Sequence, residues 1–184
     1  MRTFLDRLHD LKLKEVAQRQ IKISEKNLRG QVEMLGLASA FRSCLLRAPG
    51  EPISLISEVK SRAPGRNNVD RLVPEDVVSD FEAGGAKAIS VLTDEKWFGG
   101  SLETLEKAHR ATALPLLHKD FIVTSYQLLE GRVRGASAAL ILAYYFQETE
   151  LLQIIDETRK FGLEAVVECS LENELPRVLA VNPD

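Results

Sequence analysis

The sequence predicts an α/β fold in which helices cover a parallel sheet. After residue 52, apolar stretches of strand length alternate five times with stretches of helical periodicity. The apolar stretches are hydrophobic at consecutive positions, as in Ala139-Leu140-Ile141-Leu142, which is typical of strands buried on both faces. Three helix-to-strand connections share one design, a glycine and a short turn, at Gly85, Gly135 and Gly162.

The first 50 residues are expected to be helical. Apolar residues recur on one face over residues 1–30, and Gly30 is expected to end that helix. A second helix is expected over residues 31–47, before two prolines and a glycine break the chain. We therefore predict a helical N-terminal extension, residues 1–50, and a repeating α/β body, residues 51–184.

The elements of the body follow from periodicity and from start and stop signals. Pro74 suits a first helical turn and Ser101 a helix N-cap, while Asp94–Gly100 is expected to be a loop. The expected strands are Ile53–Lys60, Ala88–Thr93, Leu114–Phe121, Ala138–Ala143 and Glu164–Cys169. The expected helices are Glu75–Ala83, Leu102–Thr112, Ser125–Arg134, Thr149–Phe161 and Leu171–Ala180.

The spacing of the strand ends favours a (β/α)8 TIM-barrel type of fold. The ends recur at intervals of 24 to 33 residues, close to the repeat of such a barrel. A doubly wound open sheet is the alternative, but the sequence has neither a GxGxxG turn nor a P-loop. Since five units are present and a closed barrel has eight, we expect an incomplete barrel. A fragment of a longer chain is the favoured interpretation, and completion by association is the other.

Composition and charge narrow the function classes. The formal net charge of −3 gives no general attraction to nucleic acid or to an anionic membrane. No leader pattern and no apolar stretch of membrane-spanning length is present, so we expect a cytoplasmic protein. Cys44 and Cys169 are far apart and show no metal-ligand spacing, which predicts reduced thiols and no metal site.

Charged side chains stand at the ends of alternate expected strands. They are Glu58 and Lys60 in the first, Lys119 in the third and Glu168 in the fifth. Because barrel active sites lie at the carboxyl ends of the strands, these side chains are expected to share one pocket. Lysines that face glutamates shift each other's pKa values and can separate acid from base roles. The alternative is that they are solvated loop ends or simple ion pairs.

Four stretches carry a family resemblance: Ser57–Lys60, Ser90–Leu102, Pro115–Val123 and Val166–Glu168. They are similar to indole-3-glycerol phosphate synthase, the second and third being specific, and the similarity spans the chain from Phe4 onward. The resemblance implies a (β/α)8 barrel with a helical extension. It also implies ring closure of 1-(2-carboxyphenylamino)-1-deoxyribulose 5-phosphate in tryptophan biosynthesis, a carboxy-lyase reaction that releases carbon dioxide and water without metal or organic cofactor.

The resemblance also implies roles for individual residues. Lys119 is the general acid that protonates the substrate ketone oxygen, and Glu168 is the general base of the dehydration. Lys60 holds the substrate carboxylate or phosphate, with a share in the acid role left open, and Glu58 positions the lysines. Four apolar side chains complete the set as substrate-binding candidates: Phe121, Trp97, Phe98 and Leu140. Core packing is an equal alternative for Trp97 and Phe98.

The sequence departs from the family pattern in several places. Ala63-Pro64-Gly65 stands where the family has Ser-Pro-Ser, and His118 stands where it commonly has Arg. We expect His118 to be a packing or rim residue, and His9 and His109 to lie on helix surfaces. The Asn-Arg, Glu-Ser-Gly and glycine-rich phosphate motifs of strands six to eight are not found. The 184-residue chain is therefore expected to bind substrate poorly and to turn over little.

Two other functions are alternatives to the synthase. A shortened, non-catalytic barrel that serves as a binding or assembly subunit is favoured by the changed Ala63-Pro64-Gly65 loop. The neighbouring isomerase of the pathway is disfavoured by Lys119-Asp120-Phe121 and by the helical extension. Candidate partners are the phosphorylated small-molecule substrate, other tryptophan-pathway enzymes and a second copy of the chain.

Overall fold

The computed structural model describes residues 3–63 and 73–184. The chain forms two compact units, each assembled from separate stretches of sequence. Unit 1 comprises Met1–Gly36, Phe121–Val133 and Ala139–Asp184. Unit 2 comprises Leu37–Asp120 and Arg134–Ala138. The division at residue 50 into an extension and an α/β body stays a prediction.

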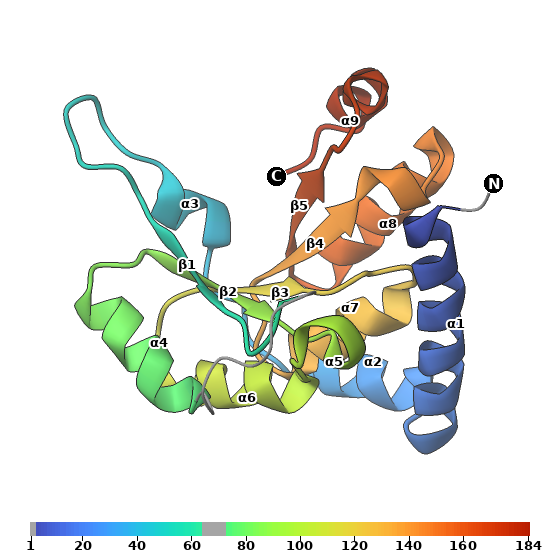
Figure 1. The fold of residues 1–184 in the computed structure, drawn as a ribbon, viewed down its shortest axis with the longest axis horizontal. Coiled ribbons are helices and arrows are strands. Elements are labelled where there is room, and N and C mark those ends of the chain that lie inside the picture. Colours follow the sequence, from blue (N-terminus) through green and yellow to red (C-terminus); the bar gives the residue numbers. More distant parts are fainter. Residues whose placement is uncertain (1–2, 64–72) are drawn as a thin grey trace. The chain divides into compact units, whose positions relative to one another are not determined.

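Unit 2 contains three parallel strands, β1 (Ile56–Val59), β2 (Ala88–Leu92) and β3 (Leu116–Lys119). In register, Ile56 lies opposite Ala88, and Ile89 lies opposite Leu116. The helices of this unit are α3 (Phe41–Leu45), α4 (Pro74–Ala83), α5 (Glu95–Phe98) and α6 (Leu102–Ala111). Figure 1 shows α4 and α6 beside each other along the strands.

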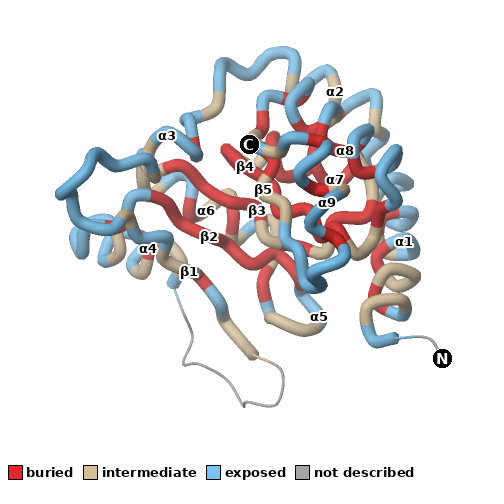
Figure 2. The backbone as a smooth tube through the Cα atoms, turned by 90° about the horizontal axis from the view of Figure 1, so that it is seen from above, coloured by how far each residue is buried: buried red, intermediate tan, exposed pale blue. Residues whose placement is uncertain are grey.

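The core of unit 2 lies between these strands and the helices that cover them. Every residue of β2 is buried, as are the apolar residues of β3 (Figure 2). Val78 of α4 and Leu105 of α6 are fully buried and contribute the apolar side of each helix. Strands β2 and β3 and the amphipathic helices therefore give the packing that the sequence pattern predicts. In β1 only Val59 is buried, so this strand departs from the prediction.

Unit 1 holds two strands that are hydrogen-bonded neighbours, β4 (Ala138–Leu142) and β5 (Glu164–Glu168). Of β4, the residues from Ala139 on belong to this unit. Two short 3-10 helices, η1 (Ala143–Tyr145) and η2 (Glu172–Glu174), also belong to it. Its α-helices are α1 (Phe4–Lys22), α2 (Glu25–Glu33), α7 (Ser125–Val133), α8 (Glu148–Lys160) and α9 (Leu175–Ala180). Helix α7 contacts α2 and α8, and α8 contacts β5 (Figure 1).

Polar contacts attach the two N-terminal helices to later parts of unit 1. Arg19 of α1 forms an ion pair with Glu130 of α7 at 2.9 Å. The Tyr126 hydroxyl donates to the Ile23 carbonyl at 2.8 Å, where α1 ends. At the other end of α1, the Tyr144 hydroxyl lies 2.8 Å from the hydroxyl of Thr3, its N-cap, and 3.0 Å from Asp6. Both ends of α1 are therefore fixed by residues more than 100 positions away in sequence.

The predicted start and stop signals of the later elements are confirmed. Pro74 occupies the first turn of α4, and the Ser101 hydroxyl accepts from the Thr104 N–H at the start of α6. Gly85, Gly135 and Gly162 have φ values of 90°, 92° and 76°. Because glycine adopts positive φ without steric cost, each of these joins can turn sharply from helix to strand.

Three predictions about helices were wrong. The first helix ends at Lys22, because Ile23 is extended and the Ser24 hydroxyl caps a new helix, so Gly30 lies inside α2. The helix expected over residues 31–47 is reduced to α3, and Leu37 within that range is fully exposed. An exposed leucine has no core to stabilise a helix through it. The expected loop Asp94–Gly100 contains the short helix α5.

Smaller differences concern the element ends and the thiols. The strands are shorter than expected by one to four residues, and the last helix is split into η2 and α9. Cys44 and Cys169 form no disulfide bond, in agreement with the predicted reduced thiols. Within the described part of the chain, no helix is long and apolar enough to cross a membrane.

Candidate active site

Three of the predicted catalytic residues meet in unit 2. The carboxylate of Glu58, on β1, accepts a hydrogen bond from the Lys119 ammonium at 2.6 Å and another from the Lys60 ammonium at 2.6 Å. Each lysine uses a different carboxylate oxygen. The structure thereby brings together two of the predicted cations and the glutamate predicted to position them.

The parallel register explains why residues so far apart in sequence meet. Glu58 lies opposite Ser90 of β2, and Leu92 at the end of β2 lies opposite Lys119. All three strands therefore end at the same edge, which is where barrel proteins place their chemistry. Lys60 follows β1 directly, so the turn out of the strand returns its ammonium to the Glu58 carboxylate.

The electrostatics of this cluster favour the charged form of Glu58. Burial opposes ionisation of Glu58, but hydrogen bonds and charge from Lys119 and Lys60 outweigh it, so the pKa of this carboxyl lies below its ordinary value. The side chains of Glu58, Lys119 and Lys60 remain 28%, 37% and 41% exposed. The two ammonium groups are thus held in place and still open to a ligand.

The loop after β2 is built by one carboxylate and two glycines. The Asp94 side chain accepts from the N–H groups of Trp97 and Phe98, at 2.6 and 3.3 Å, which caps α5. Gly99 ends α5 with φ 65°, and a Cβ at Gly100 would overlap the Leu92 carbonyl. Only glycine fits at position 100, so this loop has one path past the end of β2.

The aromatic residues of this loop are partly exposed. Trp97 and Phe98 are both half-buried, and the Lys96 ammonium lies 5.7 Å from the centre of the Trp97 ring. Arg62, in the segment after β1, donates to the backbone carbonyls of Glu95 and Lys96 in α5. The loops after β1 and β2 are therefore linked. The substrate-binding role of Trp97 and Phe98 stays a prediction.

Glu168, Phe121 and Leu140 lie in unit 1. Glu168 is the last residue of β5 and is exposed. Phe121 is half-buried, and its carbonyl accepts from the Gln127 side chain at 3.0 Å. Leu140 lies in β4 and is buried. Convergence of these three residues with Lys119 stays a prediction, and so do their roles.

The structure can be compared with what we expected for the three histidines and for the loop that departs from the family pattern. His118 is buried, with 1% exposure, as expected for a packing residue. His109 is exposed on α6, also as expected. His9 is half-buried rather than on the surface, because its ring stacks against Tyr145 at 5.3 Å between centroids. Of the Ala63-Pro64-Gly65 departure, Pro64 and Gly65 lie outside the described residues.

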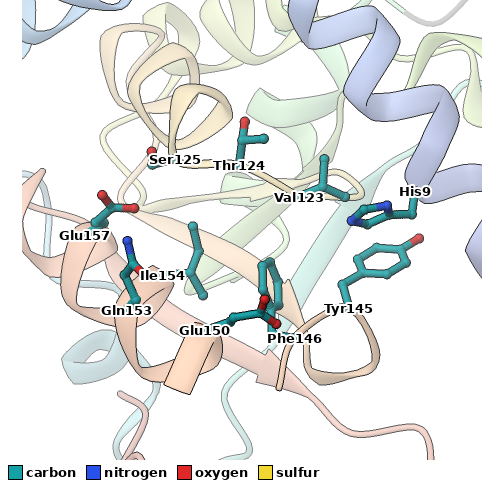
Figure 3. A pocket seen from close by; sticks show the side chains of 10 residues that line it. All are labelled: His9, Val123, Thr124, Ser125, Tyr145, Phe146, Glu150, Gln153, Ile154 and Glu157. Carbon is teal, nitrogen blue, oxygen red and sulfur yellow. The ribbon is translucent and has the colours of Figure 1, made fainter. Parts of the chain in front are cut away.

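A separate pocket of about 290 Å³ lies in unit 1. Figure 3 shows His9 and Tyr145 at one side of it and Gln153 and Glu157 of α8 at the other. None of the eight predicted site residues lines this pocket. No sequence pattern predicts this pocket, because its lining comes from α1, the residues that lead into α7, the end of η1 and α8, which share no motif. No group of three or more metal-ligating side chains occurs among residues 3–63 and 73–184.

Repeated strand–helix units whose parallel strands carry ionisable side chains at their carboxyl ends define the (β/α)-barrel class of protein. The sequence model of one family in this class, indole-3-glycerol phosphate synthase, matches residues 5–184. The chain belongs to the indole-3-glycerol phosphate synthase family. Membership confirms the predicted resemblance and, with the five alternating units, the barrel-type α/β fold.

Relatives that carry this family name are similar over most of the chain. The indole-3-glycerol phosphate synthase of Streptomyces griseus is 36% identical over 176 residues, which are 95% of this chain and 64% of the relative. That of Mycolicibacterium gilvum is 35% identical over 178 residues, 96% of this chain and 64% of the relative. That of a Nocardioides species is 40% identical over 139 residues, 75% and 53% of the two chains. The chain spans less than two thirds of the length of these relatives.

Proposed function

We propose that this protein acts as an indole-3-glycerol phosphate synthase. The reaction is a carbon–carbon lyase step in tryptophan biosynthesis, in which 1-(2-carboxyphenylamino)-1-deoxyribulose 5-phosphate closes its indole ring and loses carbon dioxide and water. The observation that carries the proposal is the pairing of Lys119 and Lys60 on the single carboxylate of Glu58. The family of the relatives supports the same reaction.

Lys119 is assigned as the general acid. Ring closure places negative charge on the ketone oxygen as the aromatic carbon attacks, and a proton delivered there lowers the barrier. The Glu58 carboxylate accepts a hydrogen bond from the Lys119 ammonium and holds it in one orientation. Because the Lys119 side chain stays partly exposed, the substrate oxygen can reach the ammonium.

Lys60 and Glu168 are assigned the supporting steps. Lys60 holds an anionic group of the substrate, its carboxylate or its phosphate, since its ammonium is held by Glu58 on one side and solvent-accessible on the other. Glu168 is assigned as the base that removes a proton during dehydration, as a carboxylate at the end of a strand can. Trp97, Phe98, Phe121 and Leu140 are assigned to the aromatic end of the substrate.

The setting of the reaction is also part of the proposal. We place it in the cytoplasm, with the phosphorylated substrate as the small-molecule partner. Other tryptophan-pathway enzymes and a second copy of the chain are the proposed protein partners. No metal or organic cofactor takes part in the proposed reaction.

The test is a chimera in which residues 1–184 replace the matched segment of the Streptomyces griseus relative. Indole-3-glycerol phosphate is followed by its fluorescence, and the 184-residue chain is assayed in parallel, alone and with a separately supplied C-terminal segment of that relative. Turnover by the chimera supports the proposal. A folded chimera without turnover, reproduced with the Mycolicibacterium gilvum relative as the host, overturns it and favours a non-catalytic binding subunit.

A further inference from the structure

Thr93, directly after β2, contacts three consecutive residues where β3 ends: His118, Lys119 and Asp120. The backbone N–H of Thr93 donates to the Lys119 carbonyl at 3.0 Å. Its hydroxyl donates to the Asp120 carboxylate at 2.8 Å and lies 2.9 Å from Nε2 of His118. Thr93 therefore holds Lys119, the predicted acid, in two ways. Its N–H binds the Lys119 carbonyl, and its hydroxyl binds the side chains of the two residues that flank Lys119 in sequence.

The directions of these hydrogen bonds fix the form of the histidine. A hydroxyl has one proton to give, and here it goes to Asp120. Thr93 Oγ1 therefore accepts from His118, which places a proton on Nε2 of that ring. The result is a directed chain that runs from His118 through Thr93 to Asp120.

Burial makes this hydrogen-bonded set of three side chains rigid. Thr93, His118 and Asp120 are 5%, 1% and 8% exposed, so water does not compete freely for their polar atoms. A buried donor or acceptor that loses its partner is left unsatisfied, which holds the three side chains to their contacts. Successive side chains of a strand point to opposite faces. The hydrogen bonds of His118 and Asp120 with Thr93 therefore hold β3 from one face, while the Lys119 side chain extends from the other.

We propose that Thr93 is a positioning residue that, through His118 and Asp120, fixes the backbone of Lys119 so that its ammonium meets Glu58. Glu58 fixes the far end of the Lys119 side chain, and Thr93 fixes its origin. A displacement of about 1 Å at a reacting group can cost about 100-fold in rate, so the placement of this backbone matters to the reaction. The effect on rate rests on the proposed synthase function, whereas the effect on the Lys119–Glu58 contact does not.

The first experiment needs no turnover. The Glu58 carboxyl of the 184-residue chain is titrated by carbon-13 NMR in the unchanged chain and in Thr93→Val, Thr93→Ser and Thr112→Val. Thr93→Val, which removes the hydroxyl at nearly constant volume, should raise the pKa of Glu58 toward its ordinary value, because Lys119 leaves the carboxylate. Thr93→Ser keeps the hydroxyl and should restore the unchanged titration.

The controls separate positioning from general stability. The Thr112 hydroxyl is hydrogen-bonded to Glu82 and to the Leu114 N–H, before β3 begins, so Thr112→Val also loses two hydrogen bonds, here more exposed and away from Lys119. It should leave the Glu58 titration unchanged. If Thr93→Val does not fold, Thr93→Ala gives the same comparison with a smaller side chain. A folded variant without the hydroxyl that keeps the Glu58 titration of the unchanged chain overturns the proposal.

The second experiment measures the reaction in the Streptomyces griseus chimera. Thr93→Val should lower kcat by about 10- to 100-fold with KM changed by less than about twofold, and Thr93→Ser should recover most of the rate. Unchanged kcat in Thr93→Val overturns the positioning role. If the unmodified chimera is inactive, the synthase proposal fails and the titration alone decides the role of Thr93.

Discussion

The Lys119 ammonium lies 2.6 Å from the carboxylate of Glu58, a residue 61 positions earlier in the chain. This contact spans from β1 to β3, with β2 between them in the sheet. A lysine on one strand is thereby held by a carboxylate two strands away.

Lys119→Ala should remove at least about 100-fold of kcat in the active chimera, the scale of one general acid. The measurement is the rate of indole-3-glycerol phosphate formation at saturating substrate. Lys87→Ala is the matched control, because Lys87 is exposed and precedes β2 at the opposite end of the strand. A loss smaller than about threefold for Lys119→Ala, or an equal loss for Lys87→Ala, contradicts the assignment.

Glu58→Gln should lower the free energy of unfolding at neutral pH and should leave it unchanged at a pH below the pKa of Glu58 in the folded chain. The pKa of Glu58 in the folded chain is below its ordinary value of 4.5, so its contribution is present above 4.5 and is lost as the pH falls through the lowered value. Since its partners are more than a third exposed, the effect should be at most about 1 kcal/mol.

Urea unfolding followed by the fluorescence of Trp97, the single tryptophan, measures this difference at several pH values. Glu103→Gln is the control for the effect of salt. It removes the ion pair between Glu103 and Lys107, in which the carboxylate is far more exposed than that of Glu58. Added salt should abolish the effect of Glu103→Gln before that of Glu58→Gln. A Glu58→Gln difference that grows as the pH falls has the wrong sign for the observed contacts.

Gly100→Ala should destabilise the chain by at least about 2 kcal/mol, because the added Cβ overlaps the Leu92 carbonyl and the loop has no other path. Gly30→Ala is the opposite case. Gly30 lies inside α2 with open space around it, so alanine should stabilise by about 1 kcal/mol. Thermal unfolding of the two variants gives the comparison, and equal melting temperatures would refute it.

Tyr144→Phe should loosen the start of α1, because the lost hydroxyl contacts both Thr3 and Asp6. Faster amide exchange is expected over the first turn of α1, with a stability loss of about 1 kcal/mol. Tyr126→Phe, which loses the bond to the Ile23 carbonyl, should instead speed exchange at the end of the same helix. The same exchange pattern in both variants would show that these hydroxyls do not act locally.

The order of the strands and helices could be predicted from sequence because buried parallel strands and amphipathic helices have distinct apolar patterns. The site cluster could be predicted for a related reason: charged residues directly after apolar stretches mark strand ends, and parallel strand ends share an edge. Lys60 and Lys119 were found in this way. That they share the Glu58 carboxylate needs the register of three strands, which no local pattern contains.

Other features could not be predicted because their causes are not local. Helix α5 has four residues and depends on the Asp94 cap, so it is too short for a helical periodicity to show in the sequence. Gly30 indicates a helix end by propensity, but the Glu25–Arg29 ion pair and the burial of Leu28 outweigh a cost of about 1 kcal/mol. Thr93 looked like an ordinary strand-end residue. Its contacts with His118 and Asp120, 25 and 27 residues later, appear only in the structure.

The anchoring of α1 by distant residues has a consequence for synthesis on the ribosome. Arg19 meets Glu130 across 111 residues of chain, and at about 5–20 residues per second its partner is made roughly 5–20 s later. During that interval the nascent N-terminal segment has emerged without the surface that holds it in the finished protein. Slowing translation between these two positions should therefore prolong the exposure of this segment to proteases and to chaperones.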